Sequence, residues 1–275
     1  MRSRKVLWKY AGITRAVVVS AVAAAAAVTT NISPIHAQAF PDSVKDFSPG
    51  RNAGFGAAYF PANVLGPPQG TSNPQVPNAN QQDLLSLGTG GSITLEFSTH
   101  RVINGPGADF TIFENPVQPI NFPEQSFVDS AIVSVSEDGD TWIAFPVDLV
   151  STSTSQLRYK NNYVGFAGIM PTYSNPANGI SPFDPGVSGG DQFDLEDIGL
   201  AAVRFIRITD TGDAAYKPTY DKDGDLVNDY GNFLDPDPTQ NGLGISAGFD
   251  LDAVAAIHTE PWSPPAGIVT WSLYD

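Results

Sequence analysis

Cysteine is absent from this 275-residue sequence. The chain therefore has neither a disulfide framework nor a thiolate metal site, and no cysteine is available for lipid attachment. Basic residues are also scarce, because 14 Lys and Arg stand against 29 Asp and Glu. A surface with this excess of negative charge repels the phosphates of nucleic acids and of anionic lipids, which makes both poor partners, whereas it suits divalent cations.

Long apolar runs are missing except for one near the N-terminus. The run at 16–28 follows five basic residues and precedes small residues that end at Ala39, which is the order of a secretory signal peptide. Its 13 residues are fewer than the roughly 20 that a membrane-spanning helix needs. We therefore predict a signal peptide over 1–39 and a secreted bacterial protein, extracellular, at the cell surface or in the periplasm, with no membrane insertion after cleavage. An N-terminal membrane anchor is the alternative.

Helical periodicity is hard to find, whereas turn-forming residues are abundant, with 26 Gly and 23 Pro spread along the chain. Short apolar segments between turn clusters are typical of an all-β sandwich or barrel. Apolar and polar residues alternate over 92–97, as in a strand with one buried face. We predict one antiparallel β-sandwich domain over 40–275. Its long connections, which are rich in Pro, Asn, Gly and Asp, are expected at 61–83, 171–191 and 210–247.

Further strands are expected later in the chain. Segments 131–136 and 141–145 flank the turn sequence EDGD, which indicates a hairpin. Segment 201–209 is apolar on both faces, which predicts a central strand. Segment 249–257 alternates so that its apolar residues point inward and its two aspartates share the opposite face.

The sequence DKDGDLVNDYGN at 221–232 predicts a calcium site. Ca²⁺ prefers six to eight hard oxygen ligands, and a loop with side-chain oxygens at alternate positions wraps them around one point. The spacing resembles the calcium loops of thrombospondin-type and dockerin-type repeats more than an EF-hand, and we place the loop in an insertion at about 217–240. A solvated acidic turn is the alternative. The predicted ligands are Asp221, Asp223, Asp225, the carbonyl of Val227, Asp229 and Asn232.

A second, scattered set of acidic residues lies near the ends of expected strands. Because strand ends converge in a sandwich, these residues could form one calcium-binding rim, and two carboxylates two residues apart on a strand are about 6.6 Å apart. The alternative is that they fix turns and cap strands through local hydrogen bonds. The set comprises Asp109, Glu114, Asp191, Asp194, Asp250 and Asp252.

No catalytic constellation stands out. The sequence GVSGG at 186–190 fits G-x-S-x-G, but prolines precede it and no helix is expected after it, unlike a nucleophile elbow. His100 and His258, the two histidines after the predicted signal, are expected in a turn and at a strand end. A two-carboxylate glycosidase needs only a suitably spaced acidic pair, and the sequence marks none. Trp142 is predicted to be a core residue. Other aromatic residues that could stack on sugars are Tyr163, Tyr173, Trp262 and Trp271.

Several segments together resemble a known family. They are similar, taken in order, to exported bacterial proteins described as "cell surface protein". The segments are NAGFG, FPANVLGPPQG, LSLGTGGSITLEF, GPGADFTIFENP, VSVSEDGDTW, GGDQFDLEDIGL, VRFIRITD and GFDLDAVAAIH. Within them, VSVSEDGDTW and RFIRIT resemble the strand motifs of discoidin-like, galactose-binding-like jelly rolls. The resemblance implies a sandwich with ligand-binding loops at one end, but it does not name a ligand.

Three functions agree with these observations. The first is a calcium-stabilised, non-catalytic binding module for glycan or another cell-surface component, using aromatic residues at loop ends. The second is a purely structural surface-layer or matrix protein, in which calcium stiffens loops. The third is a glycan-active enzyme.

Overall fold

The fold is taken from a computed structural model, which describes residues 39–227 and 247–264, all within one compact unit of the chain. These residues form short strands joined by long loops, with 3-10 helices and no α-helix among them. No helix in these ranges has the length and hydrophobicity to cross a membrane. The 3-10 helices are η1 (Ala57–Tyr59), η2 (Ala62–Val64), η3 (Lys160–Asn162) and η4 (Leu195–Ile198). The strands are β1 (Ser43–Ser48), β2 (Leu85–Ser86), β3 (Ser92–Glu96), β4 (His100–Ile103), β5 (Phe110–Phe113), β6 (Ala131–Ser136), β7 (Ile143–Ala144), β8 (Asp148–Leu149), β9 (Tyr163–Val164), β10 (Asp191–Phe193), β11 (Ala202–Val203), β12 (Phe205–Asp210), β13 (Asp250–Leu251), β14 (Ala253–Ala256) and β15 (Thr259–Pro261).

The largest sheet has five antiparallel strands in the order β1-β3-β12-β6-β7. Strand β12 lies at its centre, as the apolar character of both of its faces predicts, and Ile206 and Ile208 are fully buried. The predicted hairpin is also present, because β6 pairs with β7 and Gly139 in the turn has a φ of 86°. Main-chain hydrogen bonds on both sides therefore fix the register of β12.

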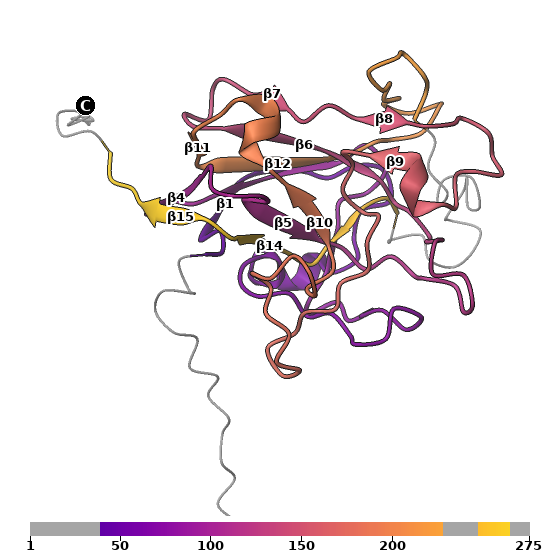
Figure 1. The fold of residues 1–275 in the computed structure, drawn as a ribbon, viewed down its shortest axis with the longest axis horizontal. Helices are drawn as coiled ribbons and strands as arrows, with labels where there is room; N and C mark the ends of the chain where they lie inside the picture. The colour runs from indigo at the N-terminus through magenta and orange to yellow at the C-terminus, as the bar shows by residue number, and fades with distance from the viewer. Residues whose placement is uncertain (1–38, 228–246, 265–275) are drawn as a thin grey trace, which may run out of the picture. The chain divides into compact units, whose positions relative to one another are not determined.

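A second sheet, in the order β10-β5-β14, packs against the first to form the sandwich (Figure 1). Ile93 and Val133 from the five-stranded sheet and Phe110 and Val254 from the second sheet belong to one buried cluster. The Phe193 ring of β10 stacks on the Phe110 ring of β5, with 5.3 Å between centroids. The all-β antiparallel sandwich predicted from the sequence is thus the fold of the described chain.

The predicted strand at 201–209 is divided between two sheets. β11 pairs with β4, which also pairs with β15, whereas β12 belongs to the five-stranded sheet. The change of sheet occurs at Arg204, whose guanidinium binds Glu96 at 2.7 Å and lies 3.4 Å from the centroid of the Trp262 ring. Strands that pass from one sheet to another at a bend form the corners of a sandwich.

The structure departs from the strand patterns at two positions. The single strand expected over 249–257 is interrupted at Asp252, which lies between β13 and β14 and is only 4% exposed. Trp142 is half-buried, not in the core, and the Arg207 guanidinium carbon lies 3.7 Å from the centroid of its ring. Alternation predicts which residues are buried only while a strand continues, and the strand is interrupted at Asp252. Trp142 is covered instead by the long cationic side chain of Arg207.

Candidate functional site

The acidic loop is closed by Asp221. Its Oδ1 accepts the backbone N–H groups of Asp223 and Asp225 at 3.0 and 2.9 Å, and its Oδ2 accepts the N–H of Leu149 in β8 at 3.0 Å. Burial raises the pKa of Asp221, but donation by these backbone N–H groups outweighs it and holds the pKa below its ordinary value. Val227 is fully buried and packs with Val128, while the Asp223 side chain is exposed and contacts Lys222 at 2.8 Å. The loop is thus fastened to the sandwich at Asp221.

Two of the predicted loop ligands, Asp229 and Asn232, lie outside the described residues, as does Trp271. In the ranges 39–227 and 247–264, no three His, Asp or Glu side chains form a group that could hold a metal ion. The calcium loop therefore remains a prediction.

Two of the scattered acidic residues are engaged in hydrogen bonds of their own within the fold. Buried Asp109 accepts the N–H of Leu195 at 2.8 Å and pairs with His258 Nδ1 at 2.9 Å. Asp194 is the N-cap of η4 and accepts the N–H of Glu196 at 2.9 Å. The contact of Asp194 is the capping role that was the alternative to a metal site, whereas Asp109 joins segments that are far apart in the sequence.

Glu114 feels the charges of three other acidic residues, Asp129, Asp191 and Asp250. Asp129 was not among the acidic residues that the sequence indicated. Glu114 is 2% exposed, and its Oε2 has no hydrogen-bond partner in the described part of the chain. Burial, followed by the charges of Asp129, Asp250 and Asp191, raises the pKa of Glu114 well above its ordinary value. A carboxyl group in this position holds its proton, because the charged form is neither solvated nor opposed by a cation among these neighbours.

Asp191, the first residue of β10, fastens a neighbouring loop. Its Oδ2 accepts the N–H groups of Gly168 and Ile169 at 2.8 and 2.9 Å, and its Oδ1 accepts that of Met170 at 3.2 Å. Burial raises the pKa of Asp191 to about 7, although these three hydrogen bonds and the charge of Lys160 oppose the shift. The side chain therefore titrates near neutral pH while it holds the 168–170 loop.

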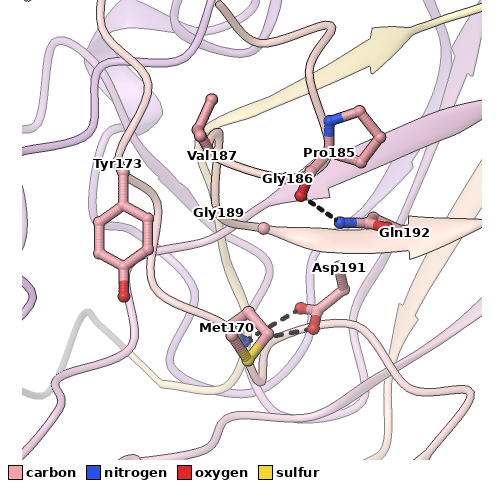
Figure 2. A pocket seen from close by; sticks show the side chains of 9 residues that line it. Met170, Tyr173, Pro185, Gly186, Val187, Gly189, Asp191 and Gln192 are labelled. Atoms are coloured by element: carbon pink, nitrogen blue, oxygen red, sulfur yellow. Dashed lines mark hydrogen bonds between the residues drawn. The ribbon is translucent and has the colours of Figure 1, made fainter. Parts of the chain in front are cut away.

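A pocket of about 220 Å³ opens beside Asp191 (Figure 2). Tyr173 lies on one side of it, and Asp191 and Gln192 lie on the other. The Gln192 amide donates to the Pro185 carbonyl at 2.7 Å, which fixes its orientation. Val187 is 52% exposed and provides an apolar edge. The pocket thus combines an aromatic ring, an amide, a carboxyl group and apolar surface.

The pocket loops are held together through backbone contacts. The N–H groups of Tyr173 and Ser174 both donate to the Ser188 carbonyl at 2.9 Å, and the N–H of Gly190 donates to the Pro171 carbonyl at 3.2 Å. Gly189 has a φ of 71°, and a Cβ at this position would overlap the Pro171 carbonyl oxygen. The two loops therefore approach each other as closely as they do because residue 189 is a glycine.

The G-x-S-x-G match has no catalytic surroundings. Ser188 is fully buried, and its hydroxyl donates to the Gly189 carbonyl at 2.9 Å. The segment before it is loop, and strand β10 follows it, in place of the strand and helix of a nucleophile elbow. His258 is engaged with Asp109, and His100, predicted in a turn, begins strand β4.

Comparisons with known proteins give no family. No protein-family profile matches the chain, and no curated protein matches it. A solved structure described as a glycoside hydrolase has a TM-score of 0.26 and 8% identity, covering 64% of this chain and 22% of its own. The C-terminal domain of a chitobiase from Bacteroides fragilis has a TM-score of 0.24 and 9% identity, covering 63% of this chain and 65% of its own. This chain therefore spans less than two thirds of either structure, and at these scores neither indicates its function.

Proposed function

We propose that this protein is a secreted, calcium-stabilised, non-catalytic binding module that acts at the bacterial surface, outside the cell or in the periplasm. Its ligand is proposed to be a sugar unit of a glycan, or a cell-surface component of similar polarity, bound in the pocket between Tyr173 and Gln192. The observation that carries this proposal is the pocket itself, in which a fixed amide and an aromatic ring face one small cavity.

The lining of the pocket suits a sugar ring. One face of a pyranose is apolar and stacks on aromatic rings, while its hydroxyls need both donors and acceptors. Tyr173 supplies the ring, and partial burial raises the pKa of Tyr173, so its hydroxyl stays protonated and can donate. At about 220 Å³ the pocket is smaller than the roughly 300–1,000 Å³ of pockets for drug-sized ligands, which favours a single sugar unit over a larger group.

Binding without catalysis agrees with the acidic residues at the pocket. Glycoside hydrolysis uses two carboxyl groups about 5–9.5 Å apart on either side of the scissile bond. Asp191 is the single carboxyl group among the described residues that line this pocket, and its oxygens accept three backbone N–H groups. The pair that such an enzyme requires is therefore not offered by the described lining.

The test is a glycan-array screen of the secreted protein with and without calcium, followed by calorimetry with the glycan that binds. We expect Tyr173→Ala to weaken binding at least about tenfold, because aromatic stacking contributes roughly 1 kcal/mol or more beyond buried area and its hydroxyl contact is lost as well. Tyr59→Ala is the matched control, since Tyr59 is an exposed tyrosine, 43% accessible, that does not line the pocket.

The alternative of a purely structural surface-layer or matrix protein makes the opposite prediction. It is favoured by the number of buried carboxylates that fasten loops, such as Asp109 and Asp210. If no glycan on the array is bound in either condition, or if Tyr173→Ala binds as well as the unaltered protein, the proposed glycan binding in this pocket is wrong and the structural alternative is favoured.

A further inference from the structure

The pocket beside Tyr173 has no positive charge in its described lining. No Lys, Arg or His is among these residues, and Asp191 brings their single carboxyl group. A sugar carboxylate or sulfate that leaves water needs cationic partners or several aligned donors, and in this pocket it would meet the carboxyl group of Asp191 instead. Acidic sugars are therefore poor ligands for the pocket.

The Asp191 carboxyl group is equally unsuited to hold an ammonium group. It is 8% exposed, and its oxygens already accept the N–H groups of Gly168, Ile169 and Met170. An amino sugar with a free ammonium group would lose its hydration beside a carboxyl group that is engaged with the main chain. The lining thus favours an uncharged ligand.

The Gln192 amide has hydrogen-bonding capacity to spare. One N–H of its Nε2 donates to the Pro185 carbonyl at 2.7 Å, and the reversed amide would place its oxygen against that carbonyl (Figure 2). Its Oε1 accepts no hydrogen bond from the described residues, and its second N–H donates none to them. Gly189 also lines the pocket, and its main-chain N–H has no acceptor within the described ranges. An uncharged ligand therefore finds an acceptor and donors here.

Apolar side chains stand in the same lining. Met170 and Val187 are 36% and 52% exposed. Covering them with a methyl group of a ligand removes apolar surface from water, which is favourable. A plain hexose carries hydroxyls in place of such a methyl group, so it could use the polar groups of the lining but would leave these two side chains hydrated.

We propose that the pocket selects a 2-acetamido sugar, a hexosamine whose nitrogen carries an acetyl group. This inference rests on the glycan-binding function proposed above and names the class of sugar. The ring stacks on Tyr173, the acetamido N–H donates to Gln192 Oε1, and the acetamido methyl covers Val187. The acetamido carbonyl accepts the N–H of Gly189. An acetamido group is uncharged and combines one donor, one acceptor and one methyl group, which are the features that the lining asks for.

The test compares methyl glycosides of N-acetylglucosamine and N-acetylgalactosamine with those of glucose and galactose, titrated into the secreted protein in calcium and followed by NMR. At least one acetamido sugar should bind about tenfold or more tightly than its parent hexose, since a methyl contact and a hydrogen bond are both added. Saturation transfer from the protein should be strongest at the acetyl methyl protons. Methyl glycosides of glucosamine and glucuronic acid should bind no better than the parent hexoses.

Two variants test the named contacts through the ratio of acetamido-sugar affinity to parent-hexose affinity. Gln192→Met keeps the size of the side chain and should bring this ratio close to one. Val187→Ser should lower the ratio severalfold and decides the question if Gln192→Met binds neither sugar. Val164→Ser is the matched control, because Val164 is also 52% exposed but does not line the pocket.

The outcomes separate this inference from the function on which it rests. Equal binding of acetamido and parent sugars, a preference for a charged sugar, or an unchanged ratio in Val187→Ser would overturn the acetamido inference, while binding that Tyr173→Ala weakens would still support a glycan pocket. Absence of binding by every sugar would overturn both.

Discussion

Replacing Gly189 with alanine should separate the two loops of the pocket. The φ of 71° at this position costs an alanine about 1–2 kcal/mol, and its Cβ would overlap the Pro171 carbonyl oxygen and lie 2.9 Å from the Tyr173 ring. Relief of that overlap stretches the hydrogen bonds from Tyr173 to Ser188 and from Gly190 to Pro171, each worth about 0.5–1.5 kcal/mol. We therefore expect the free energy of unfolding to fall by about 2–5 kcal/mol.

Gly179→Ala is the control that isolates the close approach. Gly179 has nearly the same φ, 74°, but a Cβ there would have nothing within 4 Å. Its substitution should cost only the conformational term of about 1–2 kcal/mol. Urea unfolding followed by tryptophan fluorescence measures both variants under the same conditions.

Ligand binding gives a second measurement on the same pair of variants. Gly189→Ala should weaken binding in the pocket, because Tyr173 moves with its loop, whereas Gly179→Ala should not. Equal losses of unfolding free energy in the two variants would refute the argument, since the whole effect would then be the positive φ and not the packing of one loop against the other.

Three shorter predictions follow from buried and anchoring groups. Burial raises the pKa of Asp191 to about 7 from an ordinary 3.8, so its contribution to stability is complete below about pH 4 and is lost as pH rises through about 7. The free energy of unfolding should thus fall by roughly 2–3 kcal/mol between about pH 5 and pH 8, and Asp191→Asn should flatten this fall in melting curves; an unchanged slope would contradict it. Asp221→Ala should destabilise the protein by about 1–3 kcal/mol even in a chelator, because three backbone N–H groups lose their acceptor, whereas exposed Asp223→Ala should have little effect in the same denaturation assay. The exported chain should begin at or near Phe40 if residues 1–39 are the signal, or at Gln38 if cleavage follows Ala37, in which case the hydrogen bond from the Ala256 N–H to the Ala39 carbonyl at 2.7 Å is kept; an intact mass that retains Met1 would contradict both.

The regular parts of the fold could be predicted because their signals are local. Alternation over 92–97, the turn sequence between 131–136 and 141–145, and apolar residues on both faces of 201–209 each depend on a few neighbouring residues. The structure confirms strands in all of these segments and the central place of β12. It also divides 201–209 at Arg204, and that division depends on contacts with the distant residues Glu96 and Trp262.

The candidate sites were less predictable because their residues come from segments with no periodic pattern. Tyr173 could be noted as one aromatic residue among several, but nothing in the sequence places it opposite Gln192, whose position depends on the contact between two loops. The sequence pattern suggested that Asp252 and Asp250 share a cation. In the structure the charge of Asp83 acts on Asp252, and that of Asp250 acts on Glu114.

The sequence by itself determined the composition-dependent properties of this protein: an acidic chain without cysteine, rich in turns and built of short strands. Those properties follow from residue type and spacing along the chain. The tertiary structure alone decided which carboxylates are buried and what they face, since burial depends on the packing of segments far apart in the sequence. Asp252 shows the difference, because its raised pKa, its single backbone donor from Gln69 and its place beside Asn63 and Asp83 all arise from contacts more than a hundred residues apart in the chain.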